Sequence, residues 1–175
     1  LPQRRKRCFI SNVGSLNDSQ FRRNVQGGPQ KTLGQVLDRL ACLDGDGLVE
    51  DPNYNIRVPR EAVTDHAHEP PLDEEERRLN RASKETHPVY NRMQFPEPLS
   101  RPSRTISATC TRVSRESLIV VDQNTGNCRR LTVRERSALQ GFPINFQFYA
   151  RSYTAKLRLV GNALPPPAAY MFGLM

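Results

Sequence analysis

Apolar residues between positions 31 and 43 recur at intervals of three and four, which is the spacing of one face of an α-helix. These residues are Leu33, Val36, Leu37, Leu40 and Leu43. Thr32 precedes them and suits the N-cap, because its hydroxyl can accept a hydrogen bond from a free amide of the first turn. The run 44–47 contains two glycines, which permit the turn that ends a helix. The pattern therefore predicts an amphipathic helix over residues 31–43.

Short apolar runs at residues 8–13 and 118–121 predict two strands. The turn-forming residues 124–127 follow the second run, so we expect the chain to reverse direction there. Between residues 50 and 99, prolines interrupt any long periodic pattern. In this stretch only residues 72–79 have a helical pattern.

Capping residues define the start of that short helix. Asp73 is placed to accept from the amide of Glu76, and we expect Leu72 to pack near Leu79.

A second capping pattern lies near the carboxyl end. Thr132 and Glu135 have the spacing of a capping box, in which each side chain accepts from the backbone amide of the other residue. Gly141 is suited to end this helix in the left-handed conformation. A last helix is predicted to start at Pro166 or Pro167, since proline is tolerated in a first turn.

The positive charge of the chain predicts a polyanionic partner. The net charge is +8, the isoelectric point is about 9.8 and the mean hydropathy is -0.64. Residues 101–175 carry eleven Lys or Arg against three acids, whereas residues 61–100 carry nine acids against five bases. Clustered cations gain affinity for nucleic acid by displacing counterions from phosphates. The carboxyl-terminal third is therefore the predicted nucleic-acid face.

Other properties of the sequence indicate a soluble, cytoplasmic protein. No stretch has the roughly 20 apolar residues of a membrane span, and no signal peptide opens the sequence. The four cysteines are scattered without paired spacing, so neither a zinc site nor a disulfide framework is indicated. His66 and His68 lie in a polar loop flanked by proline, and we predict no metal site there.

Three segments of the sequence stand out as motifs. They are residues 2–7 (Pro-Gln-Arg-Arg-Lys-Arg), residues 130–143 (Arg-Leu-Thr-Val-Arg-Glu-Arg-Ser-Ala-Leu-Gln-Gly-Phe-Pro) and residues 161–166 (Gly-Asn-Ala-Leu-Pro-Pro). In this order they resemble the Gln-x-Arg-x-Arg motif, the ninth motif and the tenth motif of the DNA cytosine-5 methyltransferase family. One motif alone would be weak, but the ordered set is specific.

The resemblance implies an α/β protein. It would be the carboxyl-terminal part of a doubly wound, S-adenosylmethionine-dependent methyltransferase fold, with a small, irregular, mixed α/β target-recognition domain. Residues 1–13 would end the catalytic domain, residues 14–128 would form the target-recognition region, and residues 129–175 would return to the catalytic domain.

The resemblance also implies roles for particular residues. Arg5 and Arg7 would line the pocket of the flipped cytosine, since a guanidinium holds several acceptors at fixed angles. Asn162 and Ala163 would lie at the edge of the S-adenosylmethionine site. A solvated basic patch and a plain turn before a helix are the simpler interpretations of these two pairs.

Further cations are expected to contact DNA, although arginines that only solvate a face are almost as common. The predicted contacts are Gln3, Arg101, Arg104, Arg112 and Arg115. We assign packing and no chemistry to four residues of the second motif: Leu131, Val133, Leu139 and Phe142.

The family's reaction also needs groups that this sequence does not contain. The nucleophilic cysteine of the family follows a proline, but the four cysteines here follow Arg7, Ala41, Thr109 and Asn127. We therefore expect this chain to be inactive alone. Its predicted partners are double-stranded DNA and the amino-terminal half of the same enzyme, in cis or as a separate chain, with a homodimer as a further expectation.

The leading hypothesis is part of a bacterial, nucleoid-associated enzyme, paired with a restriction endonuclease. It would transfer a methyl group from S-adenosylmethionine to a flipped cytosine in duplex DNA. The alternative is a non-catalytic DNA-binding module derived from such an enzyme. An RNA-directed relative is a third, weaker option, because the same pocket chemistry can serve transfer RNA.

Overall fold

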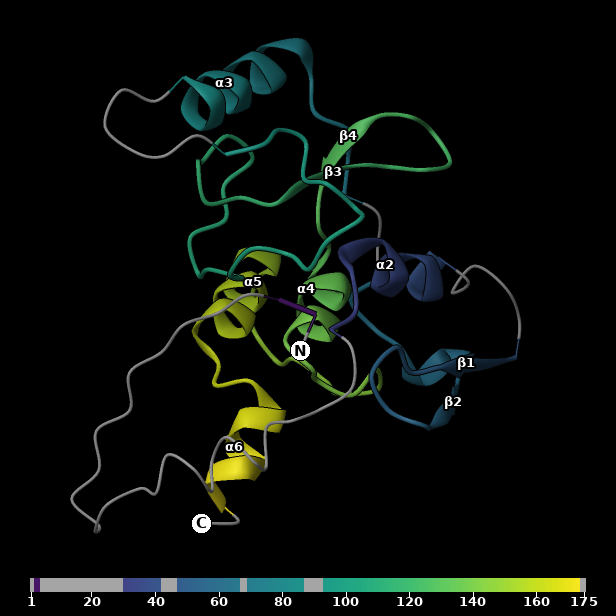
Figure 1. The fold of residues 1–175 in the computed structure, drawn as a ribbon. Coiled ribbons are helices and arrows are strands. Elements are labelled where there is room, and N and C mark those ends of the chain that lie inside the picture. Colours follow the sequence, from purple (N-terminus) through teal and green to yellow (C-terminus); the bar gives the residue numbers. More distant parts are fainter. Residues whose placement is uncertain (1, 4–29, 42–46, 67–68, 87–92, 174–175) are drawn as a thin grey trace, which may run out of the picture.

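The computed structural model describes residues 2–3, 30–41, 47–66, 69–86 and 93–173 (Figure 1). The predicted strand at residues 8–13 and the predicted pocket residues Arg5 and Arg7 lie outside this part of the chain. The helices and strands, with the short 3-10 helix η2, are α2 (Leu33–Ala41), β1 (Leu48–Glu50), β2 (Arg57–Pro59), η2 (Arg60–Ala62), α3 (Glu74–Glu85), β3 (Ile119–Val121), β4 (Cys128–Arg130), α4 (Val133–Leu139), α5 (Tyr153–Asn162) and α6 (Pro166–Gly173).

Helix α4 is the centre of the molecule. Each of the residues 131–142 is buried, so this helix and both of its ends lie inside the protein. The capping box is present as predicted, because Thr132 Oγ1 accepts from Glu135 N at 3.1 Å and Glu135 Oε2 accepts from Thr132 N at 2.7 Å. Gly141 follows the helix with φ +79°, which confirms its predicted place.

Helix α2 packs its apolar face on α4, as the periodicity predicted. Leu33, Val36, Leu37 and Leu40 are buried in one hydrophobic cluster with residues of α4 and α5. Thr32 Oγ1 accepts from Gln35 N at 3.2 Å and so caps the first turn. One core therefore unites residues on both sides of the predicted boundary between residues 128 and 129.

Two antiparallel hairpins flank this core. The pair β3 and β4 turns at Gly126, with φ +71°, and confirms the reversal expected at residues 124–127. The pair β1 and β2 was not predicted, since each strand has three residues and only Val49 and Val58 face the core. Both sheets of the described residues are two-stranded and antiparallel. The described residues therefore do not themselves form the doubly wound parallel sheet that the resemblance implies.

Helix α3 lies apart from α4 and α5 (Figure 1). Its capping box is present, since Asp73 Oδ1 accepts from Glu76 N at 2.8 Å. The expected packing of Leu72 near Leu79 was wrong. Leu72 packs with Phe95 and Ile119 in a small second cluster, whereas Leu79 is 38% exposed.

Helix α5 lies beside α4, and helix α6 lies farther out, near the carboxyl terminus (Figure 1). Helix α5 was missed, because the sequence indicated only a turn at residues 161–162, which instead end this helix. Helix α6 begins at Pro166, as predicted, and none of its residues is buried. Within the described part of the chain, no helix has the length and apolar character needed to cross a membrane.

Candidate functional site

The first motif meets the rest of the described chain at Gln3. Gln3 forms a parallel bridge with Ser103 and is only 3% exposed. Its Oε1 accepts from Ile106 N at 3.1 Å, and Ser103 N donates to Pro2 O at 3.0 Å. The side chain predicted to contact DNA therefore anchors residues 103–106, and its contact with DNA stays a prediction that would require it to leave this position.

The segment Ser107–Cys110 continues from that anchor and passes between α4 and α5. From the α4 side, Arg136 Nη1 donates to Cys110 Sγ at 2.8 Å, and Arg136 Nη2 donates to Ser107 O. From β4, Arg130 Nη1 donates to Cys110 O at 2.6 Å. Two arginines thus hold the segment from one side.

Helix α5 meets the same segment through Gly161, the glycine of the third motif. A Cβ placed there would overlap backbone atoms of Ser107 and Ala108. Only glycine allows the two backbones to approach so closely. The third motif and the predicted recognition region therefore share a direct contact.

Asn162 and Ala163 lie just beyond this contact. Asn162 is the last residue of α5 and is exposed, while Ala163 is half-buried with φ -63° and ψ 145°. The structure brings these two residues together with Gly161 at one helix end. It leaves the Asn162 side chain accessible to a ligand, which is compatible with the edge of a cofactor site.

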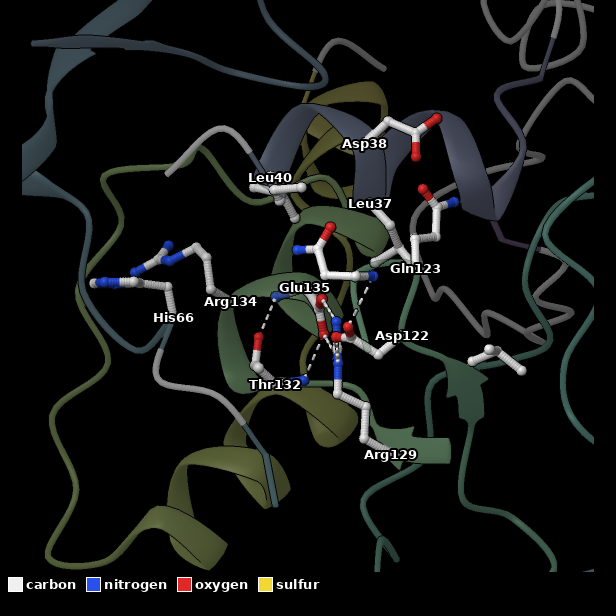
Figure 2. A pocket seen from close by; sticks show the side chains of 13 residues that line it. Leu37, Asp38, Leu40, His66, Asp122, Gln123, Arg129, Thr132, Arg134 and Glu135 are labelled. Atoms are coloured by element: carbon white, nitrogen blue, oxygen red, sulfur yellow. Dashed lines mark hydrogen bonds and ion pairs between the residues drawn. The ribbon is translucent and has the colours of Figure 1, made fainter. Parts of the chain in front are cut away.

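A hollow of about 80 Å³ lies between α2, the turn of the β3–β4 hairpin and the start of α4 (Figure 2). Arg129 pairs there with Asp122 at 2.7 Å and with Glu135 at 2.8 Å. The hydrogen bond from Arg129 lowers the pKa of Asp122 to about 2. Burial acts to lower the pKa of Arg129, but Glu135 and Asp122 raise it overall.

This hollow has the character of a structural junction. Its lining includes side chains that already pair with one another, namely Asp122, Arg129 and Glu135. Figure 2 shows Asp122, Arg129 and Glu135 converging, with Arg134 and His66 lying together to one side. The pair between Arg129 and Glu135 therefore joins the β3–β4 hairpin to α4, the helix of the second motif.

Arg134 and Asp65 form another junction. Asp65 has φ +62°, a conformation that favours few residues besides glycine, asparagine and aspartate. Its backbone oxygen accepts from Arg134 N at 3.0 Å, and its carboxylate pairs with Lys156 of α5 at 2.6 Å. Burial lowers the pKa of Arg134 to about 10, and its guanidinium donates to Thr64 O and Phe146 O.

The arginines predicted to contact DNA fall into two kinds. Arg101 is exposed, whereas Arg104 and Arg112 are ion-paired within the protein. Arg104 Nε donates to Glu97 at 2.9 Å, and Arg112 Nη2 donates to Glu76 at 2.6 Å. Arg115 Nη1 donates to the sulfur of Met93 at 3.2 Å. Internal pairing favours a structural contribution from Arg104 and Arg112, and their contact with DNA stays a prediction.

Several buried polar residues were missed in the sequence. Asp51 is 1% exposed and accepts from Ile144 N at 2.5 Å, while Glu69 pairs with Arg130 at 3.1 Å. Burial, with a smaller contribution from Glu69, raises the pKa of Tyr153 well above its usual range. The four packing residues of the second motif, by contrast, are buried as expected: Leu131, Val133, Leu139 and Phe142.

Comparisons with known proteins agree with this arrangement of three motifs around one core. The family model for C-5 cytosine-specific DNA methylases matches residues 1–173. The chain belongs to this family, whose methyl donor is S-adenosylmethionine.

Its relatives include plant and bacterial enzymes. The chain is 51% identical over 45 residues to DNA (cytosine-5)-methyltransferase 1B of Oryza sativa subsp. japonica. The matched stretch is 26% of this chain and 3% of that protein. It is 46% identical over 43 residues to the type II methyltransferase M.FnuDI of Fusobacterium nucleatum, a stretch that is 25% of this chain and 12% of that protein. It is 48% identical over 44 residues to the type II methyltransferase M.NgoMIV of Neisseria gonorrhoeae, a stretch that is 25% of this chain and 14% of that protein. These matches span a small part of each relative, and no solved structure matches the chain significantly.

Proposed function

We propose that this chain is the DNA-recognition and pocket-closing part of a DNA cytosine-5 methyltransferase. The complete enzyme transfers a methyl group from S-adenosylmethionine to a flipped cytosine in duplex DNA. The family match over residues 1–173 is the observation that carries the proposal. The net charge of +8 supports a polyanionic substrate.

Arg5 and Arg7 are assigned to the pocket of the flipped base. Extruding a base from the stack costs a few kcal/mol, which protein contacts must offset. Guanidinium groups can donate to the O2 of cytosine and hold nearby loops in place. Gln3, buried beside Ile106, supports this assignment because it anchors the start of the same motif on the core.

Asn162 and Ala163 are assigned to the edge of the cofactor site. The exposed amide of Asn162 can donate to or accept from a ligand, and the small Ala163 permits close backbone approach. Bound S-adenosylmethionine would supply the electrophilic methyl group. These residues hold and orient it from one side, and the remainder of the enzyme supplies the other contacts.

The remainder of the enzyme is also assigned the nucleophilic cysteine, since no cysteine of this chain follows a proline. Helix α6 is assigned to contact with that remainder. None of its residues is buried within this chain, and Tyr170 on it is 66% exposed.

A reconstitution experiment tests the proposal. This chain is mixed with the amino-terminal part of its enzyme, and transfer of labelled methyl from S-adenosylmethionine to duplex DNA is measured. We expect transfer by the mixture and none by this chain alone. Transfer by the isolated chain contradicts the assignment of the nucleophile, and DNA binding without any transfer by the mixture favours a non-catalytic binding module.

The assignment of Arg7 has its own test in the reconstituted enzyme. Arg7→Ala is expected to lower turnover more than it weakens DNA binding, because a pocket residue acts after the base is extruded. Equal losses in both quantities would identify Arg7 as a phosphate contact instead.

A further inference from the structure

Arg136 is a buried cation whose two hydrogen bonds go to neutral acceptors, while the carboxylate of Glu69 acts on it only from beyond ion-pair distance. It is 1% exposed, and no carboxylate of the described residues forms an ion pair with it. Its two hydrogen-bond acceptors are Cys110 Sγ and Ser107 O. Arg129 and Arg130 of β4, by contrast, each pair with carboxylates.

A buried guanidinium without a paired charge carries a desolvation cost of several kcal/mol. Burial accordingly lowers the pKa of Arg136. An apolar side chain of similar size would fill the same space without that cost. Unlike an apolar side chain, the arginine forms directional hydrogen bonds. Its planar guanidinium holds two acceptors of the segment Ser107–Cys110 at fixed angles.

The same segment also lies against Gly161, where no side chain fits. The segment thus contacts both the Arg136 guanidinium of α4 and the backbone of α5. Gln140 Nε2 donates to Val160 O and joins the same two helices one residue before Gly161. Because no space remains at Gly161, a movement of the segment toward α5 has to displace the end of that helix.

We propose that Arg136 is a positioning residue. It fixes the segment Ser107–Cys110 and, through Gly161, the end of α5 that carries Asn162 and Ala163. This inference rests on the proposed function in one respect, because it takes Asn162 and Ala163 as the edge of the cofactor site. Arg136 would thus couple the predicted recognition region to cofactor binding without itself contacting DNA or S-adenosylmethionine.

The first test measures affinity for S-adenosylmethionine in the reconstituted enzyme. Arg136→Met keeps the length of the side chain and removes both donors. We expect it to weaken cofactor binding by about tenfold, with turnover at saturating cofactor changed by less than about threefold. Arg57→Met makes the same chemical change at a surface ion pair that is 67% exposed, and it is expected to leave both quantities unchanged.

The second test asks whether Arg136 and Gly161 act on the same contact. Gly161→Ala is expected to weaken cofactor binding by a similar factor, whereas Gly173→Ala adds a methyl group where it meets no atom. The double variant Arg136→Met with Gly161→Ala should bind the cofactor about as well as either single variant. Fully additive losses would mean two independent packing defects and would overturn the inference.

A third measurement is independent of activity. Amide hydrogen exchange of this chain should rise at residues 107–110 and at residues 160–163 together in Arg136→Met. A rise confined to residues 107–110 would also overturn the inference. If the exchange responds at both places but the wild-type reconstituted enzyme binds no cofactor, the proposed function fails and the positioning contact stands. Should Arg136→Met not fold, Arg136→Lys keeps the charge, gives up the fork, and is expected to produce the same paired rise in exchange.

Discussion

Helices α3 and α4 both begin with a capping box, but α4 is held by apolar burial and α3 by polar contacts. Both open with a capping box, formed by Asp73 and Glu76 in one and by Thr132 and Glu135 in the other. All seven residues of α4 are buried, whereas α3 buries only Asn80 and Lys84 among its twelve. Helix α4, which carries a family motif, is thus part of the core, whereas α3 is attached by polar contacts.

The polar attachment of α3 is specific in geometry. Asn80 Nδ2 donates to Arg112 O at 2.8 Å, and Lys84 Nζ donates to Asn80 Oδ1 and to Ser114 O. Arg112 in turn pairs with Glu76. Each such bond adds about 1 kcal/mol or less, but a buried partner left unsatisfied costs more. An element attached in this way can differ between enzymes without disturbing the apolar core.

The largest effect should come from the core of α4. Leu139 is fully buried, so Leu139→Ala is expected to lower the free energy of unfolding by about 3 kcal/mol. Leu79→Ala is the matched change in α3, where the side chain is 38% exposed, and it should cost less than about 1 kcal/mol. Urea unfolding followed by circular dichroism measures both. Equal losses would show that α3 is also held by apolar burial.

Lys84 gives the polar attachment a dependence on pH. Burial, with Arg104 adding to it, lowers the pKa of Lys84 from 10.5 to about 8. Between these two values the unfolded chain binds more protons, so the native state gains stability as pH rises from about 8 to 10.5 and carries the full penalty below pH 8. The gain should reach up to about 3 kcal/mol.

Other groups also titrate in this range, so the measurement is a difference between variants. The slope of unfolding free energy against pH in the wild type should be steeper than in Lys84→Met. Arg81→Met, on the exposed side of the same helix, should keep the wild-type slope. Parallel slopes for wild type and Lys84→Met would mean that Lys84 is solvated.

The two capping boxes allow the same bond to be compared in two environments. Thr132 is 3% exposed and Asp73 is exposed. Removing a cap costs about 0.5 to 2 kcal/mol, and the upper end applies where the freed amide has no access to water. We expect Thr132→Ala to cost about 2 kcal/mol and Asp73→Ala about 0.5 kcal/mol in urea unfolding. The reverse order would contradict the burial argument.

The sequence predicted features that depend on a few neighbouring residues. Both capping boxes, the glycine turn at Gly126 and the helix end at Gly141 follow from local backbone chemistry, and all are present. Helix α2 was predicted because its apolar positions repeat with a helical period.

What the sequence did not predict depends on contacts between distant residues. Hairpin β1–β2 has strands of three residues, too short to show a period. Arg136 was not singled out, because its role comes from Ser107 and Cys110, more than 25 residues away. The arginines expected to contact DNA looked exposed by type, yet Arg104 and Arg112 pair with carboxylates that the sequence could not bring to them.

The smallest effect concerns the ion pair between Asp122 and Arg129, which lies within the β3–β4 hairpin. The hydrogen bond from Arg129 lowers the pKa of Asp122 from 3.8 to about 2. The stabilisation is present above pH 4 and is lost as pH falls from about 4 to 2, because the unfolded chain then binds the proton first. Solvent screens part of it, so we expect about 1 kcal/mol. In acid unfolding, Asp122→Asn should flatten this limb of the stability curve, while Glu50→Gln, at an exposed pair with Arg57, should not. An unchanged acid limb in Asp122→Asn would mean that the pair between Asp122 and Arg129 adds no measurable stability, so that Arg129 is held by its pair with Glu135 of α4 alone.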